Sequence, residues 1–420
     1  MMFRKQKTEV LVVGAGPVGM LTALTLAREG LAVEVLDAQW RTTARSYALA
    51  LHPGSLAVLA ELGLADELVG CGHHVDKLAF YEGAERRAEI RYAALGGPHP
   101  FVLVIPQQTL EDALEKRLAG HGVKVKWNHR LASLTPERDG VAARIERLGK
   151  ESLGYAVANT GWVVESVHDT AASYVVGADG HSSSVRRALG IEFPVYGDTQ
   201  FFGVFELSAD APASSEVPVV LDGEAVSVLW PLEDGRFRWS FQLADDWEWV
   251  PSTRKKSRLA VQIGEDTFPY LDAGRLAELI AQRAPWFDAA LGDVRWSVGV
   301  RFERRLAARF GQGHAWLAGD AAHLASPVGV QSMNVGLREG HDLARRLIEI
   351  LRRGGDPDLL AAYEAERAAE WRRLLGLERP ATAAPGAEDW VRRHAERIPG
   401  TVPASGDDLG RLLGQLGLEL

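Results

Sequence analysis

The sequence is poor in several features, and each absence excludes a class of protein. Cys71 is its one cysteine, which rules out a disulfide within the chain, an iron–sulfur cluster and a cysteine-rich zinc site. No apolar run reaches the roughly 20 residues that a membrane-spanning helix needs. Positive charge is also scarce, since 47 Lys and Arg face 56 Asp and Glu, a net charge of −9. This balance argues against nucleic acid or an anionic membrane as the main partner.

What is present is typical of a soluble globular protein. With 420 residues, 46% hydrophobic and 25% charged, the chain can form two or three folding units with real cores. The basic start MMFRKQKTEV runs directly into a strand without an export segment, and the single cysteine suits a reducing compartment, so a cytoplasmic protein is expected. Cys71 stands beside His73 and His74, where a metal or nucleophile role is conceivable. A small side chain on a loop is the favoured interpretation, and no metal site is expected.

Residues 8–37 organise the chain as strand, glycine turn, helix and second strand. Val10–Val13 form an apolar, β-branched run, as in a strand buried on both faces of a parallel sheet. Gly14, Gly16 and Gly19 follow at once and fit G-x-G-x-x-G. The first glycine allows the tight turn, the second lets backbone approach a pyrophosphate, and the third lets the helix pack closely on the strand.

The second half of this unit completes a dinucleotide site. The helix start can bind phosphate because its unpaired N–H groups and positive dipole end favour an anion. Pro17, which has no N–H, falls in the first helical turn, where none is needed. Asp37 follows the second strand, about 20 residues beyond the glycines, where a carboxylate accepts from ribose hydroxyls. An acid here suits an unphosphorylated ribose, so both FAD and NAD qualify.

The middle of the chain alternates helices and strands. The spacing of apolar residues predicts a helix over 109–119, and residues 138–167 read as a hairpin. Residues 174–190 repeat the strand, turn and helix pattern, with Asp179 and Gly180 at the turn. Taken alone, such a turn is more often structural than functional.

Residues 192–292 read as antiparallel sheet. RFRWSFQL, residues 236–243, alternates strictly, which puts Trp239 and Phe241 on one apolar face. That face either packs under helices as core or forms the floor of a pocket for a flat apolar ligand.

A second chemical stretch covers residues 315–347. The strand AWLAG delivers Asp320 at its end, a loop with Pro327 and Gly329 follows, and a long amphipathic helix begins near Met333, with Asn334 as its N-cap. A helix start favours the negative charge of a reduced flavin by about 0.3–1 kcal/mol. FAD is therefore a better resident ligand than NAD.

Three motifs now stand in order: GAGPVG at 14–19, GADG at 177–180 and GDAAH at 319–323. Over residues 8–375 the chain resembles the FAD-dependent aromatic hydroxylases, the group A flavoprotein monooxygenases with the p-hydroxybenzoate hydroxylase fold. The fold class implied is α/β: a Rossmann-like FAD-binding domain with an interleaved antiparallel-sheet substrate domain and a short helical C-terminal tail. The expected boundaries are 1–76, 105–190 and 292–378 for the FAD-binding domain, 77–104 and 191–291 for the substrate domain, and 379–420 for the tail.

The resemblance also implies the cofactor-binding residues. Arg45 and Gln107 match positions that contact the FAD chain, and Asp179 matches a residue tied to both FAD and the nicotinamide cofactor. Asp320 matches a residue at the ribityl–pyrophosphate region, and Pro327 with 330–334 matches the loop that lines the flavin ring. The full expected set is Gly14, Ala15, Gly16, Pro17, Val18, Gly19, Asp37, Ala38, Arg45, Gln107, Leu131, Asp179, Gly319, Asp320, Pro327, Val330, Gln331, Ser332, Met333 and Asn334.

The chain departs from the family pattern at several points. Val330 and Ser332 stand where glycine or alanine is usual, which leaves open whether the flavin swings, and Asp37 replaces a more usual Glu. Residues 379–420 are too short for the thioredoxin-like third domain of the phenol hydroxylase branch. They carry two short helical patterns, the last around Leu412. This tail packs either on the body of the protein or on another subunit, and we expect the former.

The resemblance implies a single-component monooxygenase. NADPH or NADH reduces FAD, oxygen adds at the flavin C4a, and the resulting hydroperoxide passes one oxygen to an electron-rich aromatic ring. The nicotinamide has no fingerprint of its own and is expected to bind transiently near Asp179 and the Arg186-Arg187 pair, which either accept a 2′-phosphate or form a solvated face. A catalytic base, if any, is not identified: His52, His323 and Tyr196 are candidates without geometry.

The substrate is expected to be a small aromatic molecule. Four tryptophans between 230 and 249 indicate a broad ligand such as a polycyclic polyketide, with Trp230, Trp239, Phe241 and Pro327 as pocket residues. The other partner is O₂, without nucleic acid or membrane, and the protein is expected to be a monomer or homodimer.

Two alternatives stay open. One is a flavin-dependent halogenase or reductase on the same fold, because DWEWVP at 246–251 is similar to the halogenase signature W-x-W-x-I-P but is one residue short. The other is a non-catalytic FAD-binding protein that presents its C-terminal helices to a partner.

Overall fold

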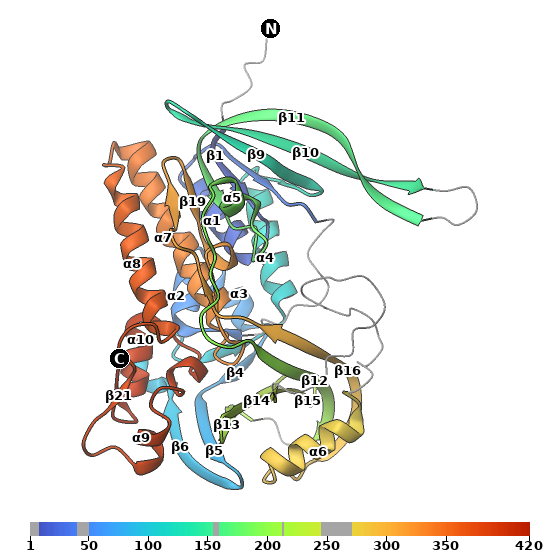
Figure 1. The fold of residues 1–420 in the computed structure, drawn as a ribbon, viewed down its shortest axis with the longest axis vertical. Helices are drawn as coiled ribbons and strands as arrows, with labels where there is room; N and C mark the ends of the chain where they lie inside the picture. Colours follow the sequence, from blue (N-terminus) through green and yellow to red (C-terminus); the bar gives the residue numbers. More distant parts are fainter. Residues whose placement is uncertain (1–7, 40–49, 154–158, 212–213, 245–270) are drawn as a thin grey trace.

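The computed structural model describes residues 8–39, 50–153, 159–211, 214–244 and 271–420. Two large sheets form the frame of the molecule, and helices α7 and α8 run side by side along one flank (Figure 1). The predicted α/β class with an interleaved antiparallel sheet is confirmed. The proposed halogenase-like hexapeptide at 246–251 and Arg45 lie outside the described residues.

The first sheet is the dinucleotide-binding one, with order β18-β19-β11-β1-β2-β8 and with β10 and β9 continuing from β11. Pairing among β19, β11, β1, β2 and β8 is parallel, which explains why the core strand Val10–Val13 is apolar on both faces. Its strands are β1 (Thr8–Val13), β2 (Val33–Leu36), β8 (Val125–Lys126), β9 (His129–Glu137), β10 (Gly140–Leu153), β11 (Asn159–Gly177), β18 (Gly311–Gln312) and β19 (Ala315–Leu317).

Strands β10 and β11 form the hairpin that the sequence predicts over 138–167. They pair antiparallel from Val141 opposite Ala172 outward, and the hairpin projects from the body of the molecule (Figure 1). The inner half of β11 remains part of the parallel sheet through β1 and β19.

Helices pack against the first sheet, beginning with the helix that follows the glycine turn. Helix α1 (Pro17–Arg28) packs between α4 (Gln107–Gly120) and α7 (Gln331–Arg353), so residues 17–26 are buried all round. The remaining helices of this part are α2 (Pro53–Glu61), α3 (Ala65–Val69), α5 (Ser184–Ala188) and α8 (Asp358–Leu374), with a 3₁₀ turn η2 (Gly319–Ala321). The helix predicted over 109–119 corresponds to α4.

The predicted N-cap of the long helix is wrong. Helix α7 begins at Gln331, and its N-cap is Val330, with a left-handed φ of 49° and no side-chain cap. Asn334 lies inside the first turn, where its side chain bonds to His52 and Ala50 of another segment and to the carbonyl oxygen of the N-cap Val330.

The second sheet has order β16-β12-β15-β14-β13-β5-β6 and is antiparallel except for the β13–β5 pair. Its strands are β5 (Lys77–Glu82), β6 (Glu85–Arg91), β12 (Gln200–Asp210), β13 (Glu216–Asp222), β14 (Ala225–Pro231), β15 (Arg236–Leu243) and β16 (Ala290–Phe302). The expected boundary at 291 falls inside β16.

The two faces of this sheet have different covers. Trp239 and Phe241 are fully buried in a cluster with α6 (Ala273–Arg283), whereas Trp230 lies in a separate cluster with the C-terminal tail. The face that the sequence marks as apolar is therefore packed under a helix as core.

The C-terminal tail packs on the body of the protein. Leu409, Leu412 and Leu413 of α10 (Gly406–Gly414) are buried against the second sheet, together with Trp390 of α9 (Asp389–Arg393). The tail also carries η3 (Pro399–Thr401), β21 (Thr382–Ala383) and β22 (Leu418–Glu419). Small sheets and one further turn complete the described fold: β3 (Ala50–Leu51), β7 (Val102–Val104) and β4 (His73–Val75); β17 (Arg305–Leu306) and β20 (His323–Leu324); and η1 (Tyr92–Leu95).

Candidate functional site

The glycine turn between β1 and α1 has the geometry of a phosphate cradle. Gly14 has φ +105°, and a Cβ there would lie 2.2 Å from the Ala178 carbonyl oxygen. A Cβ on Gly19 would lie 2.0 Å from the Gly14 oxygen, so both positions require glycine for packing. Gly16 differs, because a Cβ there would meet nothing within 4 Å. Its open side leaves the room that a pyrophosphate over the helix start needs.

Asp37 supports this turn from the end of β2. One carboxylate oxygen accepts the Ala15 N–H at 2.8 Å, and the other accepts the Gln39 N–H at 2.7 Å. Burial raises the pKa of Asp37, while these two backbone N–H groups oppose the rise. Each oxygen keeps a second lone pair for a ligand hydroxyl. Ala38 follows it in an exposed position.

Asp179 uses one oxygen for the fold and leaves the other free of protein partners. Its Oδ2 accepts the N–H and hydroxyl of Ser184 at 2.6 and 2.7 Å, which caps the start of α5. Its Oδ1 is buried and has no hydrogen-bond partner in the described part of the chain. An unsatisfied buried acceptor beside the glycine turn is what a bound nucleotide would complete, so the residues present fit FAD.

Arg186 has a structural role that the sequence did not indicate. It is buried and donates to the carbonyl oxygens of Ala321 and His181, both at 2.7 Å, while its guanidinium lies 3.9 Å from the centre of the Phe193 ring. Burial lowers the pKa of Arg186 to about 10. The expectation of a solvated face is therefore wrong for Arg186, whereas Arg187 is exposed.

A buried carboxylate holds the GDAAH motif in place. Glu339 of α7 accepts the Gly319 N–H at 3.0 Å, the His323 Nε2–H at 2.6 Å and the Trp371 Nε1–H at 2.6 Å. The side chains of Glu339 and His323 are 0% exposed, and the His323 ring stacks on Trp371 at 3.7 Å between centroids. Burial by itself raises the pKa of Glu339, but His323 and the other donors outweigh it, so this pKa lies below its ordinary value. Asp320, one residue beyond Gly319, has its pKa raised by burial.

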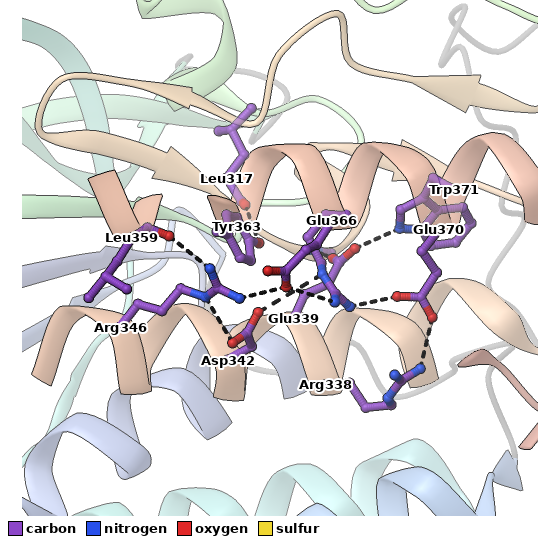
Figure 2. Close-up of polar contacts among 12 residues, drawn as sticks. Leu317, Arg338, Glu339, Asp342, Arg346, Leu359, Tyr363, Glu366, Glu370 and Trp371 are labelled. Atoms are coloured by element: carbon purple, nitrogen blue, oxygen red, sulfur yellow. Dashed lines mark hydrogen bonds and ion pairs between the residues drawn. The ribbon is translucent and has the colours of Figure 1, made fainter. Parts of the chain in front are cut away.

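Sequence reasoning missed Glu339 and the network around it. Figure 2 shows Glu339 and Trp371 reaching toward each other from α7 and α8, with Arg338 bonded to Glu370 at 2.9 Å. Arg346 bonds the Glu366 carboxylate at 2.6 Å, which joins the same two helices further along. The one available signal was an acid on the apolar face of an amphipathic helix, twenty residues after Gly319.

The predicted flavin loop is held by Asn334 and His52. The Asn334 amide accepts the His52 N–H at 2.8 Å and donates to the carbonyl oxygens of Ala50 and Val330 at 2.9 and 2.8 Å. His52 Nε2 donates to the Gly329 carbonyl oxygen at 2.9 Å. The loop before α7 is therefore tied to the segment at 50–52 through groups with little or no solvent exposure.

Asn334→Asp is expected to destabilise the protein. A carboxylate at this fully buried position would face the Ala50 and Val330 oxygens with no N–H to donate, a cost of about 3 kcal/mol or more. Denaturant unfolding of the FAD-free protein measures this change without a contribution from cofactor binding. An unchanged midpoint would mean that Asn334 does not hold the loop in solution.

His52 is expected to make stability depend on pH. Burial lowers the pKa of His52 from 6.5 to about 3, so protonation favours the unfolded chain. Stability should fall as the pH drops from 6.5 toward 3, by up to about 1.4 kcal/mol per pH unit from this group. Denaturant unfolding across this range should give a shallower slope for His52→Gln than for the wild type, and parallel curves would contradict the assignment. A group this difficult to protonate fits a positioning role better than that of a catalytic base.

Three other predicted cofactor residues stand on separate elements and make contacts that do not point to a ligand. Gln107 begins α4 and donates to Glu111 at 2.6 Å. Leu131 of β9 is buried in the core of the first sheet. The Ser332 hydroxyl accepts the Ala325 N–H at 2.9 Å, which closes the loop on itself.

A cavity of about 260 Å³ lies beside the loop that precedes α7. Ala325, Ser326, Val328 and Gln331 form one wall, and strands of the second sheet form another through Gln200 and other residues. The C-terminal tail forms a further wall, where the Gln331 amide donates to the Pro399 oxygen at 3.1 Å. None of the four residues that the sequence marks as pocket residues, Trp230, Trp239, Phe241 and Pro327, lines this cavity.

Fold and site together define an FAD-binding protein of the group A flavin hydroxylase type. The chain belongs to the FAD binding domain family, whose model matches residues 7–376. The resemblance drawn from the three motifs is confirmed.

Two monooxygenases of known name are similar to this chain in sequence. The chain is 32% identical over 380 residues to 6-methylpretetramide 4-monooxygenase of Streptomyces rimosus, covering 89% of this chain and 62% of that protein. It is 30% identical to a flavin-dependent monooxygenase of Mycobacteroides abscessus, covering 88% of this chain and 73% of that protein. This chain thus spans less than two thirds of the first of these relatives.

Solved structures show the same fold. A ternary complex of aklavinone-11 hydroxylase with FAD and aklavinone is 26% identical, with a TM-score of 0.66 over 88% of this chain and 67% of that chain. The p-nitrophenol 4-monooxygenase of Pseudomonas putida, at 22% identity, has a TM-score of 0.67 over 88% of this chain and 85% of that chain.

Among the described residues, no helix combines the length and apolar character needed to cross a bilayer.

Proposed function

We propose that this protein is an FAD-dependent monooxygenase that consumes NAD(P)H and hydroxylates an aromatic, polycyclic polyketide-type substrate. One observation carries the proposal: the loop assigned to the flavin ring forms a wall of the cavity whose other walls belong to the second sheet and the tail. A substrate in that cavity would lie beside the ring. The names of the relatives, several of which act on tetracycline-type compounds, support the same class of substrate.

Each part of the site has a task in this proposal. The first sheet and its helices would hold FAD: the 14–19 turn would hold the pyrophosphate, Asp37 would accept from ribose hydroxyls, Asp179 would accept a hydrogen bond at its free Oδ1, and Asp320 would bind the ribityl–pyrophosphate region. When bound, FAD would supply a group that NAD(P)H can reduce and that can then activate O₂. The residues of the second sheet bind the substrate.

The loop at 325–334 would orient the substrate and exclude water. It is pinned from both sides, by His52 to Gly329 and by Gln331 to the tail. A pinned loop would keep the reacting ring edge at a fixed place, and a substrate that fills the cavity would exclude the water that promotes loss of hydrogen peroxide. Val330, already in the left-handed region at φ 49°, restricts this loop further.

The remaining assignments belong to the same proposal. The nicotinamide would bind transiently near Asp179, with Arg187 as the exposed cation close by. A reducing cytoplasm fits the single, exposed Cys71. The monooxygenase relatives do not favour a halogenase, a reductase or a non-catalytic FAD-binding protein.

The test is NADPH and NADH consumption by the purified FAD-bound protein, with hydrogen peroxide measured alongside. The panel runs from simple phenols to polycyclic phenols. A ligand that accelerates flavin reduction and suppresses peroxide release supports the hydroxylase assignment and identifies the substrate class. A flavin that stays oxidised with both nucleotides and every ligand contradicts it, and chloride-dependent product formation would indicate the halogenase.

A further inference from the structure

The cavity beside the flavin loop has an unusual share of cationic side chains. Arg304, Arg373, Arg379 and Arg397 line it, each from a different segment of the chain. The acidic side chains along the same walls are Glu224 and Glu396. Arginines thus outnumber acidic side chains in this lining, which also includes the carboxyl end of the chain at Leu420.

These four arginines are not neutralised by ion pairs. Within the described residues none of them lies within 4.0 Å of a carboxylate oxygen. By contrast, Arg338 of α7 and Arg367 of α8 both form ion pairs with Glu370.

The bonds that two of these arginines do make position them. Arg397 donates to the carbonyl oxygens of Gly223 and Ala225, the latter at 2.8 Å, which fixes its chain against the second sheet. Arg304 donates to the Leu375 oxygen at 3.4 Å, and its Nε is buried without a partner. Guanidinium groups held by carbonyls keep their positive charge, although Glu224 and Asp222 act on Arg397 electrostatically from outside ion-pair distance.

The rest of the lining suits a flat organic molecule. Leu221, Val226 and Val328 provide apolar contact, and Gln200 contributes a buried Oε1 that has no partner in the described part of the chain. A mostly polar lining with a few apolar side chains, an unsatisfied amide oxygen and an excess of arginines matches a ligand with an apolar body, a hydroxyl or N–H, and an acidic group.

We propose that the substrate is a planar aromatic compound with an acidic group ionised at neutral pH, bound by this cluster of Arg304, Arg373, Arg379 and Arg397. This inference rests on the proposed function, since it assigns the substrate class of that site. Arg373 and Arg379 hold the acidic group from the tail side of the cavity. The aromatic body extends toward Val328, which places it beside the flavin loop.

Calorimetric titration of the FAD-bound protein with anthraquinone-2-carboxylate and with its neutral methyl ester tests this assignment. The two probes share an aromatic body and differ in charge. We expect the carboxylate to bind at least about tenfold more tightly, which is the effect of one charge-assisted hydrogen bond. Arg373→Met/Arg379→Met should weaken carboxylate binding by about tenfold or more and leave the ester within about twofold.

Arg372→Met is the matched control, because Arg372 neighbours Arg373 on α8, is exposed and does not line the cavity. It should leave binding of both probes unchanged. Equal affinity for acid and ester, or equal losses for both probes in the double variant, would overturn the proposal. So would the same loss of carboxylate binding in Arg372→Met, because it would indicate a general surface field.

The outcome separates this proposal from the proposed function. Charge-selective binding by a protein that oxidises neither NADPH nor NADH would leave the anion site standing and contradict the monooxygenase. Ligand-stimulated NAD(P)H oxidation without any charge selectivity in binding would support the monooxygenase and contradict the anion site.

Discussion

Gly16→Ala is expected to leave the FAD-free protein folded and to abolish tight FAD binding. In the protein alone a Cβ at Gly16 meets nothing within 4 Å, and its φ of −71° suits any residue. As the N-cap of α1, alanine should cost no more than about 1 kcal/mol. The new methyl would occupy the space where backbone and pyrophosphate approach each other. We expect the FAD dissociation constant to rise at least about 100-fold, which corresponds to about 2.8 kcal/mol.

The control for this substitution is Gly14→Ala. At Gly14 a Cβ would lie 2.2 Å from a backbone oxygen at φ +105°, so that variant should lose stability with or without FAD. Thermal unfolding of both apoproteins and fluorescence titration with FAD separate the two effects. If Gly16→Ala kept the wild-type affinity for FAD, the pyrophosphate would not lie over this glycine.

Glu339→Gln is expected to cost about 3–5 kcal/mol of folding stability and to accelerate FAD release. Three donors, from Gly319, His323 and Trp371, converge on the carboxylate. An amide in its place turns one acceptor into a donor and leaves a buried group unpaired. Since Glu339 holds the Gly319 N–H, the GDAAH turn that carries Asp320 should loosen as well. Denaturant unfolding and the rate of flavin release after dilution measure the two consequences.

The matched control is Glu349→Gln, on the same helix. Glu349 pairs with Arg353 at the surface, and exposed pairs contribute little, so this variant should change stability by no more than about 0.5 kcal/mol. The pKa of Glu339 lies below its ordinary value of 4.5, so the stability from its ionised form is present above that pH and is lost as the pH falls below it. The difference between wild type and Glu339→Gln should shrink in the same range. Equal effects of both substitutions would contradict the structural role of Glu339.

The organisation of the FAD-binding part follows from local patterns. Glycines 14, 16 and 19 have different steric demands, and their spacing next to an apolar strand predicts the turn that forms. The alternation in 236–243 predicts the strand β15, and the helix α4 follows from apolar spacing. These features depend on backbone sterics and side-chain periodicity over a few residues, which a sequence carries directly.

The use of particular side chains was decided by tertiary contacts. Asn334 has the residue type of a cap, yet β3 lies near enough to take its amide, so it bonds across segments. Arg186 sits in a basic stretch and is nevertheless buried under the GDAAH loop.

Which face of the second sheet borders a ligand was also not readable from the chain. Strict alternation separates Trp239 and Phe241 from their neighbours but does not say which face a helix covers, and α6 covers theirs.

By itself, therefore, the sequence determined the phosphate turn, the order of the elements and the flavoprotein family. The three-dimensional fold decided that Glu339 holds Gly319, that His52 is a buried neutral tether, and that four arginines from separate segments surround one cavity. The physical reason is range: a turn or a strand is stabilised by residues adjacent in sequence, whereas burial, charge pairing and cavities depend on contacts between segments far apart in the chain.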